Sequence, residues 1–124
     1  MNILVSAVLL AAASASPSIA QDAAAGEVSF AKCKACHTAS EDKNKVGPSL
    51  MGLFGRTAGT HEGFKYSPAM VDAGKGGLIW DEAKLTQYLH EPKALVKGTK
   101  MAFVGLKQDA DIANLIVYLK QFSK

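Results

Sequence analysis

Two cysteines and a histidine stand within five residues, at Cys33, Cys36 and His37, in the pattern C-x-x-C-H. Two thiols one short helical turn apart can reach the two vinyl groups of a single porphyrin, and the adjacent imidazole is then placed beneath the iron. This spacing is the attachment signature of c-type haem. The motif therefore predicts one haem, covalently attached through both cysteines, with His37 as an axial ligand.

Other kinds of site also use a cysteine pair with this spacing. A thioredoxin-like redox centre needs a βαβ pattern around the pair, and the sequence shows no such pattern. A structural zinc site needs four ligands, and only His61 or His90 could complete the set, at unsuitable spacing. A disulfide between the two cysteines would close a loop too small to constrain much of the chain. Haem attachment is therefore the preferred interpretation.

The second axial ligand is less well defined by the residues alone. The candidates are Met51, Met70, Met101, His61 and His90. A methionine is more often core filler than a ligand. Met101, however, follows a short polar loop with no packing period to explain it. The residue pattern favours Met101 and leaves the other candidates open.

Two predicted helices, one shortly before the cysteine motif and one near the C-terminus, can position the cysteines and the candidate ligands. Asp22 is typical of an N-cap for a helix over residues 23–30. On that helix Gly26 and Phe30 share one face, and the glycine allows another helix to approach closely. Residues 109–120 have apolar side chains at helical spacing and acidic residues at the positive end of the helix.

Shorter helices are predicted between these two. Ser67 followed by Pro68 indicates the start of a short helix, which Gly74 and the two glycines after it would end. Asp81 would cap a further helix that stops before Pro92, and another turn can follow that proline.

The middle of the chain is expected to be irregular. Residues 38–66 are rich in glycine, serine and threonine and predict loops. Loops of this length are uncommon unless something organises them. A domain of about 100 residues is also near the lower limit for burying an adequate core without help. We therefore expect an all-α fold in which three to five helices wrap around one covalently bound haem.

Residues 1–20 differ from the rest of the chain. An apolar run over residues 3–13 is followed by small side chains, and Ser18 and Ala20 occupy the two positions that a signal peptidase reads. The run is shorter than the roughly 20 residues that span a bilayer, although no Lys or Arg precedes it and an uncleaved membrane anchor is the alternative. We predict a signal peptide over 1–20, cleaved after Ala20, and one domain over 21–124.

The charge balance restricts the partners. The chain has 14 Lys and Arg against 11 Asp and Glu, which gives a formal net charge of +3. This is far from the dense positive stripes of nucleic-acid-binding proteins, so we expect no nucleic-acid partner. Lysines gather around the cysteine motif and again late in the chain, where two such clusters could form a positive face for an acidic partner.

Further segments follow in a consistent order along nearly the whole mature chain. With the C-x-x-C-H motif, this pattern resembles the class I c-type cytochromes, most closely bacterial cytochrome c2 of the short, mitochondrial-like kind, and it implies the cytochrome c fold. The matching segments are residues 46–50, 52–59 and 63–66, Trp80, Tyr88 and Leu89 with Pro92, residues 98–103 and residues 115–119.

The resemblance implies the axial ligands and the residue that orients one of them. Met101 would be the second ligand, on the face opposite His37, and the carbonyl of Pro48 would accept the outer N–H of the His37 ring. The chain departs from the family pattern at two positions. Met70 stands where the family often has a small amide residue, and Lys97 where it often has a proline.

Other residues would surround the haem by the same resemblance. Arg56, Tyr66 and Trp80 would donate hydrogen bonds to the propionates. Tyr88 and Thr99 would brace the methionine loop, and the ring of Phe103 would pack at the haem edge.

The resemblance also implies the function. With both axial positions filled, no open site is left for oxygen or peroxide, so we expect a periplasmic, monomeric electron carrier and not an enzyme. A cytochrome bc-type complex would donate the electrons, and a terminal oxidase or a photosynthetic reaction centre would accept them. A membrane-tethered carrier and a haem peroxidase are the alternatives. The lysines expected to dock on acidic partner surfaces are Lys32, Lys34, Lys45, Lys93, Lys97 and Lys100.

Overall fold

The computed structural model describes residues 7–12 and 22–123. This part of the chain is helical, with one isolated antiparallel bridge between Thr57 and Ile79 and no β-strand. The predicted all-α class is confirmed, while the predicted cleavage point after Ala20 lies outside the described residues. The helices are α1 (Ala23–Phe30), α2 (Pro68–Lys75), α3 (Glu82–His90), α4 (Pro92–Leu95) and α5 (Asp109–Lys120).

The predicted caps begin three of these helices. The side chains of Asp22, Ser67 and Asp81 each accept a hydrogen bond from a backbone N–H of the following first turn, at 2.7 to 3.1 Å. The predicted end of α2 is confirmed at Gly76, which is its C-cap, whereas Gly74 lies inside the helix. The helix passes through Gly74 and ends one residue later. A Cβ at this position would overlap the carbonyl of Ala58, so the glycine allows the neighbouring loop to approach closely.

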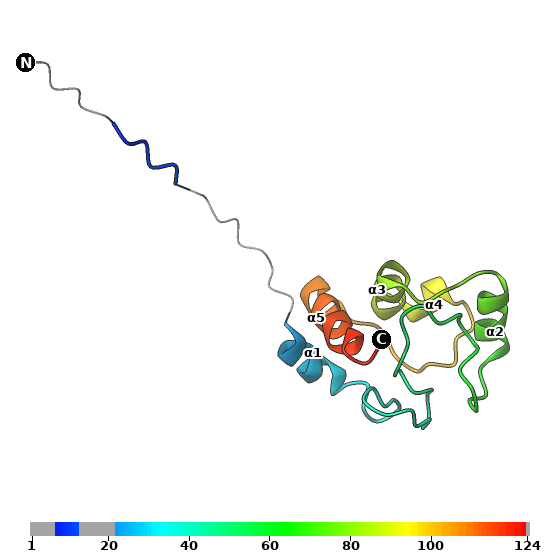
Figure 1. Cartoon of the computed structure of the whole chain (residues 1–124). Coiled ribbons are helices and arrows are strands. Elements are labelled where there is room, and N and C mark those ends of the chain that lie inside the picture. The colour runs from blue at the N-terminus through cyan, green and yellow to red at the C-terminus, as the bar shows by residue number, and fades with distance from the viewer. Residues whose placement is uncertain (1–6, 13–21, 124) are drawn as a thin grey trace, which may run out of the picture.

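The helices α1 and α5 cross in direct contact, as Figure 1 shows. The crossing point is Gly26, where a Cβ would overlap the carbonyl oxygen of Asn114 on α5. Next to it the rings of Phe30 and Tyr118 pack with their centroids 5.4 Å apart. The predicted close approach at Gly26 is thereby confirmed.

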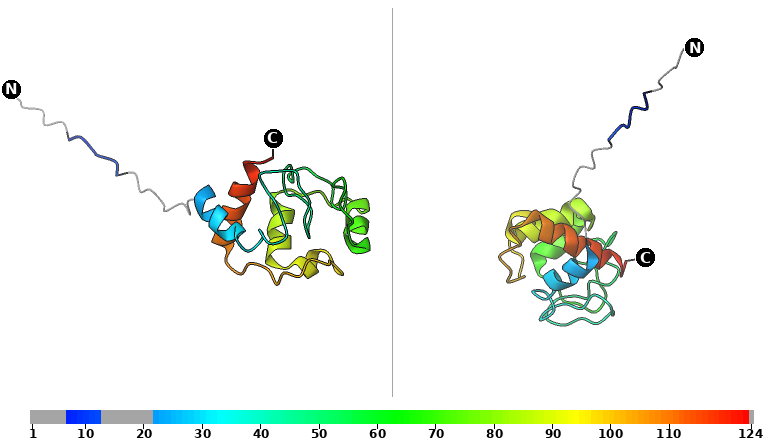
Figure 2. Two further views of the ribbon diagram at one scale, coloured as in Figure 1. Left: turned by 90° about the horizontal axis from the view of Figure 1, so that it is seen from below. Right: turned by 90° about the vertical axis from the view of Figure 1, so that its left-hand side faces the viewer.

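The remaining helices extend away from this pair. In both Figure 1 and the left view of Figure 2, α3 lies between the α1/α5 pair and α2, which forms the far end of the molecule. Lys120 of α5 forms an ion pair with Glu82 of α3. The largest fully buried side chains include Ile112 and Leu115 of α5, each 1% exposed. No helix in the described part of the chain has the length and apolar character needed to cross a bilayer.

In the long irregular segment between α1 and α2, polar contacts connect parts that are distant in sequence. The Asn44 amide donates to the carbonyl of Glu62 at 3.1 Å. The His61 ring lies 2.7 Å from the Asp42 carboxylate. These contacts connect residues 18 and 19 positions apart, so the loops have a defined shape without regular secondary structure.

The candidate haem site

A cavity of about 450 Å³ lies between the helices and the long loops. This volume falls within the range of about 300–1,000 Å³ that is usual for small-molecule and cofactor sites. Every residue that the sequence predicts to hold haem lines this one cavity. These residues are Cys33, Cys36, His37, Pro48, Arg56, Tyr66, Trp80, Tyr88, Thr99, Met101 and Phe103.

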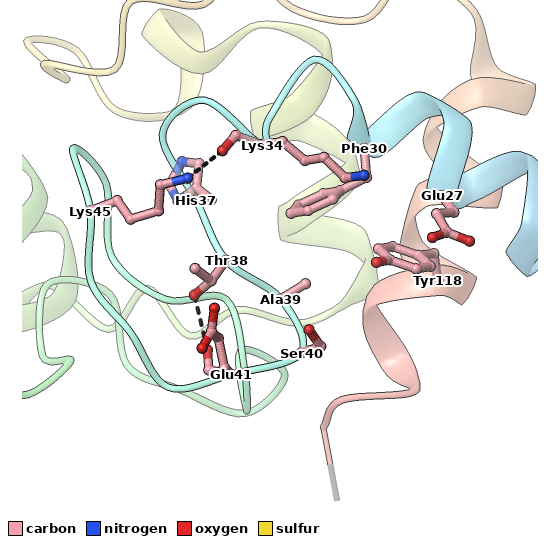
Figure 3. Close-up of a pocket in the computed structure, with 10 residues that line it drawn as sticks. All are labelled: Glu27, Phe30, Lys34, His37, Thr38, Ala39, Ser40, Glu41, Lys45 and Tyr118. Carbon is pink, nitrogen blue, oxygen red and sulfur yellow. Dashed lines mark hydrogen bonds between the residues drawn. The ribbon is translucent and has the colours of Figure 1, made fainter.

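A second pocket, of about 320 Å³, also borders His37, and Figure 3 shows the residues that line it. Neither a cysteine nor a methionine lines it. Its charged groups are Lys34 and Lys45 with Glu27 and Glu41, so the charges of the wall balance. The two cysteines and the predicted ligands His37 and Met101 therefore come together in the larger cavity, and Phe30 and His37 border both spaces.

The two cysteines lie in the turn that follows α1. This turn is closed by hydrogen bonds from the N–H groups of Cys36 and His37 to the carbonyl of Cys33, at 3.1 and 2.9 Å. Both thiols are free of a disulfide and partly buried. Burial raises the pKa of the Cys33 thiol, the neighbouring Cys36 raises it further, and Lys32 opposes the shift. The turn therefore presents both thiols to one cavity.

The ring of His37 has a defined orientation. Its Nδ1 lies 2.8 Å from the carbonyl oxygen of Pro48, which can only accept, so Nδ1 carries the proton and Nε2 is left as the ligating nitrogen. Gly47 lies against the ring, where a Cβ would overlap it. Burial lowers the pKa of His37, the Pro48 hydrogen bond opposes this effect, and Lys45 adds to it. The neutral imidazole, which is the form that binds metals, is thus favoured.

The structure separates the candidates for the second axial ligand. Met51 is 42% exposed and does not line the cavity. His61 and His90 each pair with an aspartate at 2.7 Å, and neither lines the cavity. Met101 and Met70 are the thioethers that the cavity wall contains among the described residues.

Hydrogen bonds tie the segment that carries Met101 to α3. The hydroxyl of Tyr88 lies 2.7 Å from Thr99 Oγ1, and this oxygen also accepts the backbone N–H of Met101 at 3.3 Å. The ring of Tyr88 packs against Trp80 with centroids 5.0 Å apart. Burial raises the pKa of Tyr88, and the bond to Thr99 opposes the shift.

The predicted propionate donors lie in the loops, and two of them, Arg56 and Tyr66, have hydrogen-bond partners within the protein. The guanidinium of Arg56 donates to the carbonyls of Ser49 and Met51 at 2.8 and 2.6 Å. The hydroxyl of Tyr66 accepts the N–H of His61 at 3.1 Å and keeps its own proton for another acceptor. Burial lowers the pKa of Arg56 and raises that of Tyr66, while each group opposes the shift of the other.

Sequence reasoning did not single out part of the cavity wall. Leu50, Leu53 and Phe64 line the cavity from the irregular loops. No helical or strand periodicity marks these residues, since each stands in a glycine-rich segment. The signal available was their apolar character within an otherwise polar loop region.

The six predicted docking lysines are all exposed. Lys32, from the turn after α1, and Lys100, next to Met101, also line the cavity. Lys45 donates from Nζ to the carbonyl of Lys34 at 2.7 Å, a contact visible in Figure 3. Of the remaining two lysines, Lys93 stands on α4 and Lys97 lies shortly after its end.

An all-α domain with C-x-x-C-H in the wall of a cofactor-sized cavity defines a c-type haem protein. The family model Cytochrome c matches residues 23–123, and the chain belongs to the cytochrome c family. It is 48% identical over 124 residues to cytochrome c2 of Blastochloris viridis, across 99% of this chain and 95% of that protein. It is 50% identical over 104 residues to cytochrome c-550 of Nitrobacter winogradskyi, across 83% of this chain and 93% of that protein.

A solved structure agrees with this membership. Cytochrome c2 from Rhodospirillum centenum superposes with a TM-score of 0.79 at 41% identity, covering 83% of this chain and 99% of that one. The predicted family, fold and cofactor are therefore confirmed. The chain is a monohaem electron carrier and not an enzyme, and its haem c is attached at the C-x-x-C-H motif.

Proposed function

We propose that this protein is a diffusible periplasmic carrier that takes single electrons from a cytochrome bc-type complex to a terminal oxidase or a photosynthetic reaction centre. The observation that carries the proposal is the composition of the cavity wall. It joins the two attachment thiols, one oriented imidazole and the thioether of Met101 in one space. The similarity to proteins named cytochrome c2 supports the same reading.

In this proposal both axial positions belong to the protein. His37 would ligate the iron through Nε2, with Nδ1 held by Pro48, and Met101 would supply the sulfur ligand. When bound, the haem supplies one-electron chemistry at its iron, and a methionine ligand raises the reduction potential relative to a second histidine. The bond between Tyr88 and Thr99 holds the methionine loop in place.

The remaining wall residues orient the cofactor and limit the access of water. Arg56, Tyr66 and Trp80 line the cavity and would donate to the propionates, because they supply a fixed cation and two rings with one donor each. Phe103, partly buried against the core, would pack at the haem edge. Electron exchange then needs only contact at the exposed edge.

Replacement of Met101 by alanine tests the axial pair. We expect the oxidised wild-type protein to show the near-infrared charge-transfer band of sulfur ligation, and Met101→Ala to lose it. Met51→Ala is the matched control, because its side chain lies outside the cavity and should leave the band unchanged. A band that persists in Met101→Ala, or is absent from the wild type, would overturn the ligand assignment.

The docking lysines make a separate prediction. A small, weak interface between a positive face and an acidic surface should form quickly and lose rate as salt screens the charges. We expect the rate of reduction by a purified bc-type complex to fall with rising ionic strength. Lys32→Glu with Lys100→Glu should reduce both the rate and its salt dependence, whereas Lys84→Glu on α3, outside the six, should change little. An unchanged salt dependence in the double variant would contradict this docking surface.

The tethered alternative differs from the diffusible carrier at the N-terminus. Residues 7–12 are exposed and outside any helix, and cleavage after Ala20 would remove them. N-terminal sequencing of the protein purified from its native membrane and periplasmic fractions separates the two cases. A first residue of Gln21 in the periplasmic fraction supports the carrier, and retention of residues 1–20 in the membrane fraction supports the tether.

A further inference from the structure

We propose that Met70 is a positioning residue of the haem site, which keeps the Met101 side of the cavity free of water. In this way it holds the reduction potential high and slows the replacement of Met101 by external ligands. The inference rests on the proposed function in one respect, that Met101 is the axial ligand. It concerns the second thioether in the cavity wall, for which the ligand assignment leaves no role.

The first argument is the placement of Met70. Its side chain is 9% exposed and lines the cavity. Its backbone N–H donates to Ser67 Oγ at 3.1 Å, and Ser67 is itself only 6% exposed. The start of α2 is thus anchored at a buried cap, which fixes where the side chain of Met70 can lie.

The second argument is that the start of α2 packs against the loop that carries Met101. A Cβ on Gly98 would lie 3.3 Å from the Cβ of Ala69, the residue before Met70. Thr99, the next residue of that loop, bonds Tyr88 and the N–H of Met101. The side of the cavity near Met101 is therefore built from α2, α3 and this loop.

The third argument concerns the hydrogen-bonding groups of the cavity wall near Met101. The hydroxyls of Tyr88 and Thr99 bond each other, Thr99 also receives the N–H of Met101, and Ser67 Oγ receives the N–H of Met70. Within the part of the chain that the structure describes, no buried side-chain nitrogen or oxygen lacks a partner. A buried water needs about two to four polar partners, and a thioether is only a weak acceptor. Met70 therefore fills space here without providing a site for water.

A dry environment has a defined effect on a redox centre. The oxidised iron carries one more positive charge than the reduced iron, and a low dielectric penalises the form with the greater charge. The apolar shell of a metal site thus controls both the potential and the access of solvent. A polar group at position 70 would admit water, lower the potential and open a path for other ligands.

The test compares polar and apolar replacements in the haem-loaded protein. Met70→Asn and Met70→Gln introduce an amide, the second with a size close to methionine, whereas Met70→Leu keeps an apolar side chain of similar volume. The measurements are the reduction potential and the rate at which imidazole displaces the sulfur ligand of the oxidised protein. We expect both amide variants to have a lower potential and about tenfold faster displacement, equivalent to about 1.4 kcal/mol of barrier. Met70→Leu should match the wild type in both.

Several outcomes would overturn the inference. Amide variants with wild-type potential and displacement rate would show that Met70 does not control water, even if their unfolding free energy falls. A Met70→Leu variant as strongly affected as the amide variants would show that the sulfur or its shape matters, and not the apolar character. The wild-type charge-transfer band is the separate check on Met101, since its absence would refute the ligand assignment itself.

Discussion

His37 is held from two directions by neighbours only ten and eleven residues away. Gly47 lies against its ring, and the carbonyl of Pro48 accepts the proton of Nδ1. The hydrogen bond selects the tautomer, and burial disfavours the protonated form by lowering the pKa. Each effect favours a neutral ring with Nε2 free to bind iron. The single residue thus acquires its chemistry from its immediate surroundings, and not from the motif alone.

Tyr88 makes a pH prediction at the same scale. Its pKa is raised, chiefly by burial, above the ordinary value of about 10. The unfolded chain therefore loses this proton first as the pH rises. The stabilising contribution of Tyr88 is complete below about pH 10 and is lost as the pH rises through the folded-state pKa.

We accordingly expect the free energy of unfolding to fall more steeply above about pH 10 in the wild type than in Tyr88→Phe. Urea unfolding of the haem-loaded proteins between about pH 8 and pH 11 measures this difference. Parallel curves for the two proteins would show that the phenol of Tyr88 does not titrate differently in the folded state.

At the scale of elements, the contact between α1 and α5 depends on one missing side chain. Gly26 is buried against the backbone of Asn114, and the N–H of Asp22 donates to the Asn114 side chain at 2.9 Å. The turn with both cysteines follows α1 directly, and α5 supplies Leu115 and Leu119 to the cavity wall. This crossing therefore sets the position of the attachment thiols relative to the core.

Gly26→Ala should separate the two helices because the new methyl group would overlap the Asn114 carbonyl. We expect a loss of about 3 kcal/mol in the free energy of unfolding, at the upper end of the usual cost of overpacking. Ala24→Leu, exposed on the same helix, is the control and should cost much less. Chemical denaturation followed by circular dichroism measures both. Equal stabilities would mean that the crossing tolerates a wider separation.

At the scale of the whole molecule, the cavity dominates the energetics. The cavity of about 450 Å³ is lined largely by apolar side chains, and leaving apolar surface in contact with water forgoes about 25 cal/mol per Å² of stabilisation. Domains of this size have total stabilities of about 5–15 kcal/mol. The haem must therefore act as part of the core, and the long loops around it have little else to pack against.

A chain that cannot attach haem tests this dependence. We expect Cys33→Ser with Cys36→Ser, expressed without incorporation of haem, to show little cooperative unfolding and weak protection from hydrogen exchange, most of all in residues 38–66. The haem-loaded wild type should unfold in one transition. A cooperative transition in the haem-free double variant would show that the protein core is sufficient by itself.

Much of the site was predictable because its signals are local. The spacing of Cys33, Cys36 and His37 is complete within five residues. The caps at Asp22, Ser67 and Asp81 act within one helical turn. Such patterns depend on the geometry of a few neighbouring residues and therefore survive in the sequence. The order of the matching segments then led to the family, which the comparisons confirm.

What only the tertiary structure decided concerns residues far apart in the chain. Met51, His61 and His90 lie outside the cavity, and Met70 lies in its wall. Gly74 lies inside a helix that this glycine was expected to help end. Residues 38–66 have no periodicity, so their positions follow from long-range contacts and from the space the cofactor fills. The sequence by itself determined the attachment point and the helices. The shape of the cavity, and with it the set of side chains that line it, depends on contacts that no local spacing encodes.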